Sequence, residues 1–556
     1  MKRTRWYKDA LIYQIYPRSF YDSNHDGIGD LRGIITKLDY IKSLGADAIW
    51  LCPVYDSPND DNGYDIRNYR DIAADFGNLD DWKSLKKEME QREMRLIMDF
   101  VGNHTSDEHP WFQEALHHPE SLYRDYYFFR LGKNASPPNN WTGFFGEGAW
   151  QKIEDRNEYY LRLFTRKQPD VNWDNPLVRQ EFKDILKFWI DLGVDGFRCD
   201  VITIISKENG LPDGKKRLGL TGREHYINGP HVHDYLRELY QDVLEPSDIM
   251  TVGESVMMTV DEAPQYVSEN RRELDMLFTF EHMDVDNFGG IKWLMRPFSL
   301  VRFKKVMEKW QKCMMEHQGW NSLYWENHDQ PRSVGRFHTS SISFRIESAK
   351  MLAVAMYFHQ GTPYIYQGQE LGMTNAPFNT LDQYRDTETL SIYRLSRRLH
   401  IPKWYIMWAI RRKSRDHART PMQWSNDQYA GFSTVEPWIQ VNPNFHEINV
   451  EAQEHDSNSV LQFYRKMFRL RKSLAVVKHG DYRLHFRNHR KIYMYSRNCE
   501  NDSLVIVANF SSSILRFSFP KELDYSKYQL ILSTYSTPRD SLELAPFEAR
   551  VYQKMK

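Results

Sequence analysis

Residues 177–200 read LVRQEFKDILKFWIDLGVDGFRCD and predict a helix that leads directly into a short strand. The apolar side chains at 182, 185, 186 and 189 recur at helical spacing, so they share one face of a helix over residues 177–192. The run at 194–199 is short and apolar, as expected of a buried strand. A helix that feeds a buried strand is half of a βαβ unit, which predicts a parallel sheet.

The same alternation extends in both directions along the chain. Amphipathic stretches at 36–44 and 82–91 also lead into apolar runs, and the candidate strands are residues 10–16, 48–51, 95–101, 194–199, 249–252, 274–280, 322–325 and 362–366. Eight strands separated by helices predict an α/β fold with a closed (β/α)8 TIM barrel. A doubly wound open sheet is the alternative, but no GxGxxG turn follows the first strand.

Two segments depart from this alternation. Residues 105–171 are too long for an ordinary connection and are rich in aromatic residues, Asn, Pro and Gly, which predicts an inserted, loop-rich subdomain. From residue 480 the chain shows short alternating runs typical of an antiparallel β-sandwich. We therefore expect a barrel over 1–104 and 172–479, an insertion over 105–171 and a β domain over 480–556.

Composition excludes several classes of partner. The 74 Lys and Arg residues balance 75 Asp and Glu, which gives no support for nucleic-acid or membrane binding through a basic surface. No signal peptide and no apolar run long enough to span a bilayer is evident. The four cysteines are far apart and form no CxxC pair, which favours a reducing, cytoplasmic location. Aromatic residues make up 14% of the chain, which suits a sugar-binding cleft but does not prove one.

Charged residues stand where the candidate strands end. The third strand is followed by Asn103 and His104, the fourth ends at Asp200, the fifth is followed by Glu254, and the seventh by the run at 326–329, Glu-Asn-His-Asp. The carboxyl ends of barrel strands meet at one face, so these groups are expected to converge. Two carboxylates on either side of a glycosidic bond are the minimum requirement for its hydrolysis. Arg198 lies two residues before Asp200 and therefore on the same face of the strand, where it would keep that carboxylate ionised.

These motifs resemble those of the α-amylase superfamily of glycoside hydrolases (family 13), and within it the oligo-1,6-glucosidase and α-glucosidase group. The resemblance covers essentially the whole chain. It is carried by DFVGNH at 99–104, GFRCDV at 196–201, GE at 253–254 and ENHDQPR at 326–332, with QPD at 168–170 and RTPMQW at 419–424 in support.

The resemblance implies a role for each matched residue. Asp200 would be the nucleophile, Glu254 the general acid and base, and Asp329 the group that stabilises the transition state. The sugar-binding pocket would be formed by His104, Arg198, His328, Tyr64, an Asp61–Arg415 pair that closes it, and, from the insertion, Phe144, Phe145, Phe164 and Gln168. A closed pocket admits one terminal glucose, so the enzyme would be exo-acting. Retention of configuration predicts about 5–5.5 Å between nucleophile and acid.

Two residues are expected to influence which glucosidic linkage and which aglycone the enzyme accepts. In similar enzymes, Val at the position of Val201 accompanies α-1,6 linkages, whereas Ala accompanies α-1,4 linkages. We therefore expect isomaltose and short isomalto-oligosaccharides as substrates. Glu326 departs from the Asn common at its position, and it would add negative charge near the aglycone.

The loop at 22–30 has the spacing of a calcium site. The expected ligands are the side chains of Asp22, Asn24, Asp26 and Asp30 and the carbonyl of Ile28. Gly33 stands where a bidentate Glu would complete the site, which indicates a weaker site for Ca²⁺ or Mg²⁺. An Asx-turn loop without metal is the alternative. We expect a structural ion at most, and no organic cofactor.

Three other functions fit the same scaffold. Sucrose isomerases carry an Arg-rich loop after the seventh strand, whereas residues 330–336, QPRSVGR, are hydrolase-like. A trehalose-6-phosphate hydrolase needs a basic phosphate pocket, to which Lys292 and Arg296 could contribute. A non-catalytic transporter heavy chain needs a membrane helix and tolerates loss of the acids, all three of which are present here. The favoured function is a retaining, exo-acting oligo-1,6-type α-glucosidase, as a monomer or a dimer.

Overall fold

The computed structural model describes residues 5–134, 136–337, 342–500, 502–539 and 542–555. Eight parallel strands form one sheet in the order β11-β10-β9-β5-β2-β1-β15-β14. Their bounds are β1 Ile12–Ile15, β2 Ala48–Leu51, β5 Arg95–Val101, β9 Gly196–Asp200, β10 Met250–Glu254, β11 Met276–Phe278, β14 Ser322–Leu323 and β15 Thr362–Tyr366. Strands adjacent in the sheet are adjacent in sequence, and the first lies beside the last. This is the cyclic order of a (β/α)8 barrel, so the predicted fold class is confirmed.

The helices follow the expected alternation. Their bounds are α1 Leu31–Thr36, α2 Leu38–Ser43, α3 Leu79–Gln91, α4 Pro110–His117, α5 Pro176–Asp191, α6 Val232–Leu239, α7 Pro264–Val267, α8 Leu300–Glu316, α9 Arg345–Tyr357, α10 Thr387–Arg398, α11 Lys403–Lys413, α12 Asp416–Arg419, α13 Val450–Glu454, α14 Val460–Ser473 and α15 Ala475–His479. The helix expected at 36–44 corresponds to α2, and a further short helix, α1, precedes it; Lys37 leaves helical geometry between the two.

Helix α5 illustrates how the local sequence specifies where a helix begins and which of its faces is buried. Asn175 caps its N-terminus by accepting a hydrogen bond from the N–H of Leu177, and Pro176 occupies the first turn. Its apolar face, with Phe182 and Trp189, is fully buried. The strand that follows, β9, is buried along its whole length and delivers Arg198 and Asp200.

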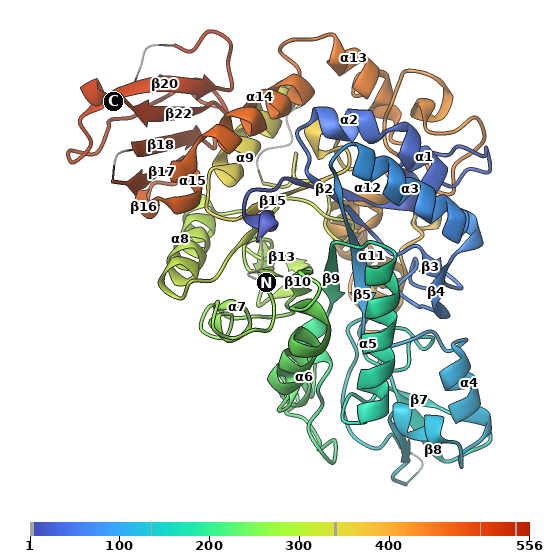
Figure 1. Cartoon of the computed structure of the whole chain (residues 1–556). Helices are drawn as coiled ribbons and strands as arrows, with labels where there is room; N and C mark the ends of the chain where they lie inside the picture. The colour runs from blue at the N-terminus through green and yellow to red at the C-terminus, as the bar shows by residue number, and fades with distance from the viewer. Residues whose placement is uncertain (1–4, 135, 338–341, 501, 540–541, 556) are drawn as a thin grey trace. The chain divides into compact units, whose positions relative to one another are not determined.

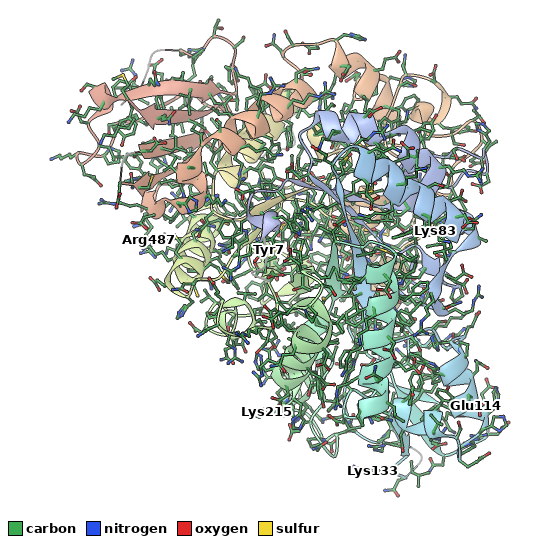
Figure 2. The ribbon with its side chains drawn as sticks, viewed as in Figure 1. Tyr7, Lys83, Glu114, Lys133, Lys215 and Arg487 are labelled. Carbon is green, nitrogen blue, oxygen red and sulfur yellow. The ribbon has the colours of Figure 1, made fainter. Side chains whose placement is uncertain are left out.

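The chain forms two compact units that are described separately. The first unit comprises Met1–Arg5, Trp50–Phe280 and Thr380–Trp408, and the second comprises Trp6–Ile49, Glu281–Asn379 and Ala409–Lys556. Exposed charged side chains such as Lys83, Lys133 and Lys215 project from the ribbon of the first unit (Figure 2).

The expected insertion belongs to the first unit and has a small sheet of its own. Its strands are β6 Phe129–Leu131, β7 Trp150–Lys152 and β8 Glu158–Leu161, in the antiparallel order β6-β8-β7. A buried ion pair ties the insertion to the loop after β9, since Nζ of Lys207 lies 2.8 Å from Oδ2 of Asp170. The same Nζ donates to Oδ1 of Asn103, just after β5. The domain boundaries at 104 and 171 stay predictions.

The C-terminal segment is the expected antiparallel β structure. Figure 1 shows its five-stranded sheet in red, in the order β16-β17-β18-β22-β20. The strands are β16 Asp481–His485, β17 Ile492–Cys499, β18 Asp502–Asn509, β20 Tyr528–Ser533 and β22 Ala549–Lys554, and a second sheet pairs β19 Leu515–Arg516 with β21 Glu543–Leu544. One apolar cluster includes Val505 from the larger sheet and Leu544 from the smaller, which makes this a sandwich core.

Two hairpins were not anticipated from the sequence. They pair β3 Tyr55–Asp56 with β4 Asn68–Ile72, and β12 Asn287–Phe288 with β13 Ile291–Met295. Both are short and irregular in register, so they leave little periodic signal. In the part of the chain that is described, none of the helices combines the length and apolar character needed to cross a bilayer.

Candidate active site

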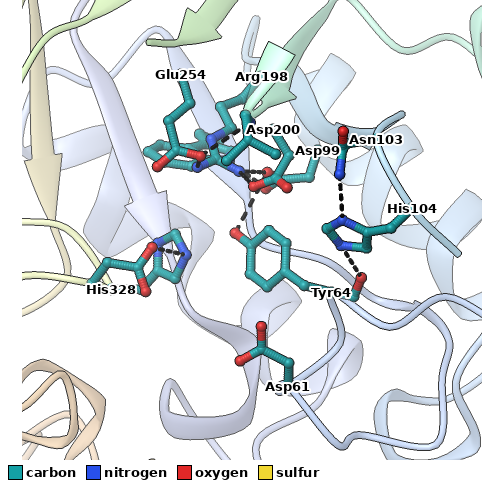
Figure 3. Close-up of polar contacts among 12 residues, drawn as sticks. Asp61, Tyr64, Asp99, Asn103, His104, Arg198, Asp200, Glu254 and His328 are labelled. Atoms are coloured by element: carbon teal, nitrogen blue, oxygen red, sulfur yellow. Dashed lines mark hydrogen bonds and ion pairs between the residues drawn. The ribbon is translucent and has the colours of Figure 1, made fainter. Parts of the chain in front are cut away.

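Three neighbouring strands of the first unit end in the charged groups singled out above. In the ladder, Asp99 on β5 lies opposite Arg198 on β9, and Val101 lies opposite Asp200. Strand β10, on the other side of β9, ends at Glu254. Parallel pairing in this register places the ends of all three strands together, and Figure 3 shows their side chains meeting.

Arg198 is the centre of this cluster. Its Nη1 lies 2.6 Å from Oδ1 of Asp99 and 2.5 Å from Oδ1 of Asp200, and its Nη2 lies 2.7 Å from Oε2 of Glu254. The guanidinium is 2% exposed. Burial opposes its charge, but the surrounding carboxylates, Glu254 foremost, outweigh burial and raise the pKa of Arg198. The two carboxylates required for glycoside hydrolysis therefore share one guanidinium.

Asp99 is a member of the cluster to which sequence reasoning assigned no role, although it begins the DFVGNH motif. It is fully buried, and its second oxygen, Oδ2, accepts a hydrogen bond of 2.8 Å from Nε1 of Trp50. Burial raises the pKa of Asp99 to about 6, against the opposing effect of Arg198. Asp99 thus orients Arg198 through the Nη1 that also contacts Asp200, while Nη2 contacts Glu254.

Val201 has an unusual backbone conformation immediately after the nucleophile candidate. Its φ of 35° and ψ of 37° lie in the left-handed region, which β-branched residues rarely occupy. This turn ends β9 and directs the N–H of Val201 to Oε2 of Glu254, at 3.1 Å. The Val201 side chain is buried in the apolar cluster of the insertion with Trp141 and Ile204. The sequence suggested a role for this side chain but not for its backbone.

Four further predicted residues meet beside this cluster. The N–H of Thr165 donates to Oε1 of Gln168, so the amide NH₂ of Gln168 points to Oδ2 of Asp61 (3.3 Å) and to Nε2 of His104 (3.2 Å). Nε2 of His104 also lies 3.2 Å from the carbonyl of Tyr64. Burial lowers the pKa of His104 to about 4, so the imidazole is neutral at neutral pH.

Aromatic rings extend this group into the insertion. The rings of Phe164 and His104 lie 5.0 Å apart, and Phe164 in turn contacts Phe144 at 4.9 Å and Phe145 at 6.0 Å. Tyr64 lies beneath the carboxylate cluster, with its hydroxyl 3.5 Å from Oδ1 of Asp99. The predicted pocket residues of the first unit are therefore brought together.

The second unit holds the third acid. Oδ1 of Asp329 lies 2.9 Å from Nη2 of Arg419 and 3.1 Å from Nη1 of Arg415. Its Oδ2 lies 3.1 Å from Nε2 of His328, whose Nδ1 is 2.8 Å from the amide nitrogen of Gln14. Burial opposes ionisation, but His328 and the two arginines outweigh it and hold the pKa of Asp329 well below its usual range.

In the sequence, Arg419 is the first residue of the RTPMQW motif, and nothing in the sequence alone links it to Asp329. Arg415 is predicted to pair with Asp61, and within the second unit it contacts Asp329. Because Asp61 and Arg415 belong to different units, their pairing stays a prediction. The meeting of Asp329 with Asp200 and Glu254 stays a prediction for the same reason.

Glu326 has a structural role that the sequence did not indicate. Its side chain is 1% exposed. Its Oε2 lies 3.0 Å from Nη1 of Arg332, and its Oε1 accepts hydrogen bonds from the backbone N–H and the hydroxyl of Ser333. Arg332 therefore balances most of the charge that we expected Glu326 to add near the aglycone. Its effect on the aglycone stays a prediction.

The predicted metal loop lies in the second unit. Asp22 accepts hydrogen bonds from the N–H groups of His25 and Gly27, and Asp30 accepts one from the N–H of Gly33. Both carboxylates are buried, and no cationic side chain among the described residues pairs with them. In that same part of the chain, no three His, Cys, Asp or Glu residues converge as a metal site. A bound ion would thus also need oxygens from Asn24 and Ile28.

Comparison with known proteins gives full-length matches. A family model described as "Alpha amylase, catalytic domain" matches residues 14–480. The chain is 51% identical over 557 residues to the oligo-1,6-glucosidase of Parageobacillus thermoglucosidasius, with 99% of each chain covered. It resembles the solved structure of a trehalose-6-phosphate hydrolase from Bacillus licheniformis, with a TM-score of 0.93, 41% identity, and 99% of this chain and 100% of that chain covered. An isomaltulose synthase from Klebsiella sp. LX3 gives a TM-score of 0.95 and 40% identity over 99% and 100% of the two chains.

The protonation of Asp99 yields a test. Below a pH of about 6, Asp99 takes up a proton and no longer balances Arg198, so kcat/KM for an α-glucoside should fall as the pH falls through this value. Asp99→Asn should lower kcat/KM at neutral pH by roughly 10- to 100-fold, the loss expected for one charge-assisted hydrogen bond, and should remove this acidic limb. The control is Asp80→Asn, an exposed residue of α3. Wild-type kcat/KM with an unchanged pH profile in Asp99→Asn would contradict the positioning role.

Proposed function

The chain belongs to the α-amylase family of catalytic domains and is a glycoside hydrolase, and on that premise we propose that it is a retaining, exo-acting α-glucosidase. Its proposed substrates are isomaltose and short isomalto-oligosaccharides, from which it releases terminal, preferentially α-1,6-linked glucose. The observation that carries the proposal is the pair Asp200 and Glu254, both buried and both held by Arg198.

In the first step, Oδ of Asp200 attacks the anomeric carbon while Glu254 gives a proton to the leaving glycosidic oxygen. The contact with Arg198 keeps Asp200 ionised and therefore nucleophilic. The bond to the leaving sugar breaks, and a covalent glucosyl ester forms on Asp200. Asp329, whose charge is maintained by His328 and two arginines, would stabilise the positive charge that develops on the sugar.

In the second step, Glu254 accepts a proton from water, and the hydroxide attacks the ester to release glucose with its original configuration. The ionised form of Glu254 acts as the base in this step, and its contacts with Arg198 and with the N–H of Val201 are those a carboxylate makes. Neutral His104, with Gln168 and Asp61, would hold the hydroxyl groups of the sugar.

The related enzymes favour this substrate over the alternatives. Oligo-1,6-glucosidases match at up to 51% identity over the full chain, whereas the trehalose-6-phosphate hydrolase and the isomaltulose synthase structures match at 41% and 40%. Arg296, considered above for a phosphate pocket, donates from Nε to the carbonyl of Val285. No described contact favours a phosphate or fructose site.

We propose a cytoplasmic location as well, supported by the four cysteines. None of the four forms a disulfide within the described part of the chain, and Cys52 and Cys199 are buried.

Substitution of the two carboxylates distinguishes their roles. We expect Asp200→Asn and Glu254→Gln each to lower kcat for isomaltose by at least about 10⁴-fold, with the thermal unfolding temperature little changed. With α-glucosyl fluoride, whose leaving group needs no proton, Glu254→Gln should still form a covalent glucosyl adduct, and Asp200→Asn should not. Mass spectrometry detects the adduct, and Asp191→Asn, exposed at the end of α5, is the control. Isomaltose turnover near the wild-type rate in either variant would refute the assignment.

The linkage preference is tested at Val201. We expect Val201→Ala to raise the ratio of kcat/KM for maltose to that for isomaltose by about tenfold, since the smaller side chain leaves room for a 4-linked sugar. Ile204→Val shortens another member of the same apolar cluster and controls for loss of packing. An unchanged ratio in Val201→Ala would place the specificity elsewhere.

We further propose a structural cation, Ca²⁺ or Mg²⁺, in the loop at 22–30, supported by the buried carboxylates of Asp22 and Asp30, whose described partners are backbone N–H groups and hydroxyls. The ion would balance these charges and would take no part in the reaction. Chelation by EDTA should lower the melting temperature by about 2–4 °C, and added Ca²⁺ should restore it. Asp22→Asn should abolish this response and Asp39→Asn, in helix α2, should preserve it. An identical melting temperature with and without EDTA would favour the loop without metal.

A further inference from the structure

A cavity of about 500 Å³ lies in the first unit, between the insertion and α10, and of its lining residues only Phe145 and Phe164 also belong to the predicted sugar-binding pocket. Its walls come from three places: the loop that carries Phe145 and Glu147, the segment 162–166 after β8, and the face of α10 that presents Ser391 and Arg394. Its volume is in the range of small-molecule binding sites.

The cavity is lined by a mixture of groups suited to a polyhydroxylated ligand. Phe145 and Phe164 provide apolar ring surfaces. Arg166 and Arg394 provide guanidinium donors, and neither takes part in an ion pair within the described residues. The carboxylates of Asp60 and Glu147 provide acceptors. A sugar hydroxyl both donates and accepts hydrogen bonds, so it can use both kinds of partner. With Arg162 included, three arginines and two carboxylates line the cavity, so its charge is close to balanced.

Buried polar side chains show that the cavity is more than a surface hollow. Arg162 is 6% exposed, and its guanidinium is fixed by Oε2 of Glu147 at 3.1 Å and by the carbonyl of Phe164 at 2.8 Å. Thr165 and Ser391, 8% and 9% exposed, add hydroxyl-bearing side chains to the same walls.

We propose that this cavity binds a glucosyl unit of an isomalto-oligosaccharide molecule other than the one in the reacting pocket. The inference rests on the proposed function, because it takes its ligand from the proposed substrate class. Phe164 separates the two sites: its ring lines the cavity and also contacts His104 of the pocket. Occupancy of the cavity therefore fixes a ring that the pocket shares.

The test counts binding sites in the full chain with turnover blocked by Asp200→Asn. Isothermal titration with isomaltotriose should show two molecules per chain. Adding Arg166→Gln and Arg394→Gln should weaken the second site by about tenfold or more, the effect expected from losing charged hydrogen-bond donors. Arg398→Gln, one turn further along α10 and outside the cavity, should leave both sites unchanged.

Ser391→Leu provides an independent variant, because the larger side chain would occupy the cavity and should also remove the second site. Two results would overturn the proposal. One is a stoichiometry of a single isomaltotriose per chain in Asp200→Asn. The other is a second site whose affinity is unchanged when Arg166→Gln and Arg394→Gln are added. Tighter binding of glucose 6-phosphate than of isomaltotriose at the second site would overturn its assignment to a neutral sugar. The proposed function is tested by a separate measurement: if it is wrong, the wild-type protein does not hydrolyse isomaltose.

Discussion

The sharing of one buried guanidinium among three carboxylates is the interaction on which the active centre depends. Arg198 contacts Asp99, Asp200 and Glu254 from the ends of three adjacent parallel strands. Three carboxylates without a counter-ion could not all be ionised in a buried cluster, since each charge would be desolvated and would repel the others. The barrel makes the arrangement possible because parallel strands in register bring their carboxyl ends to one edge.

The same principle of local charge balance recurs at three other buried ionised groups near the candidate site. Asp329 is balanced by His328, Arg415 and Arg419, Glu326 by Arg332, and Lys207 by Asp170. Removing Arg332 or Asp170 would leave a buried charge without its partner. Lys207 also links the insertion to the barrel strands, which fixes the aromatic side of the pocket relative to the carboxylates.

Much of the fold could be predicted because periodicity is a local property of the sequence. Six of the eight barrel strands lie within the apolar runs expected for them, β9 and β10 extend one and two residues beyond theirs, and the helix over 177–192 matches α5 to one residue at each end. The irregular elements could not be predicted from the sequence. The break at Lys37 and the short hairpin β3–β4 depend on single backbone conformations and bulges that leave no repeating pattern.

Residue types and their spacing are enough to indicate glycosidase chemistry: acids at strand ends, an arginine two residues before one of them, and motifs specific to a glycosidase family. How these groups are held became clear from the folded structure. It showed that Asp99 orients Arg198, that the strained backbone of Val201 points its N–H at Glu254, and that Arg419 supports Asp329. The physical reason is that residue type and spacing are encoded locally, whereas burial, and with it the pKa and pairing of each charge, depends on segments that meet only in the folded chain.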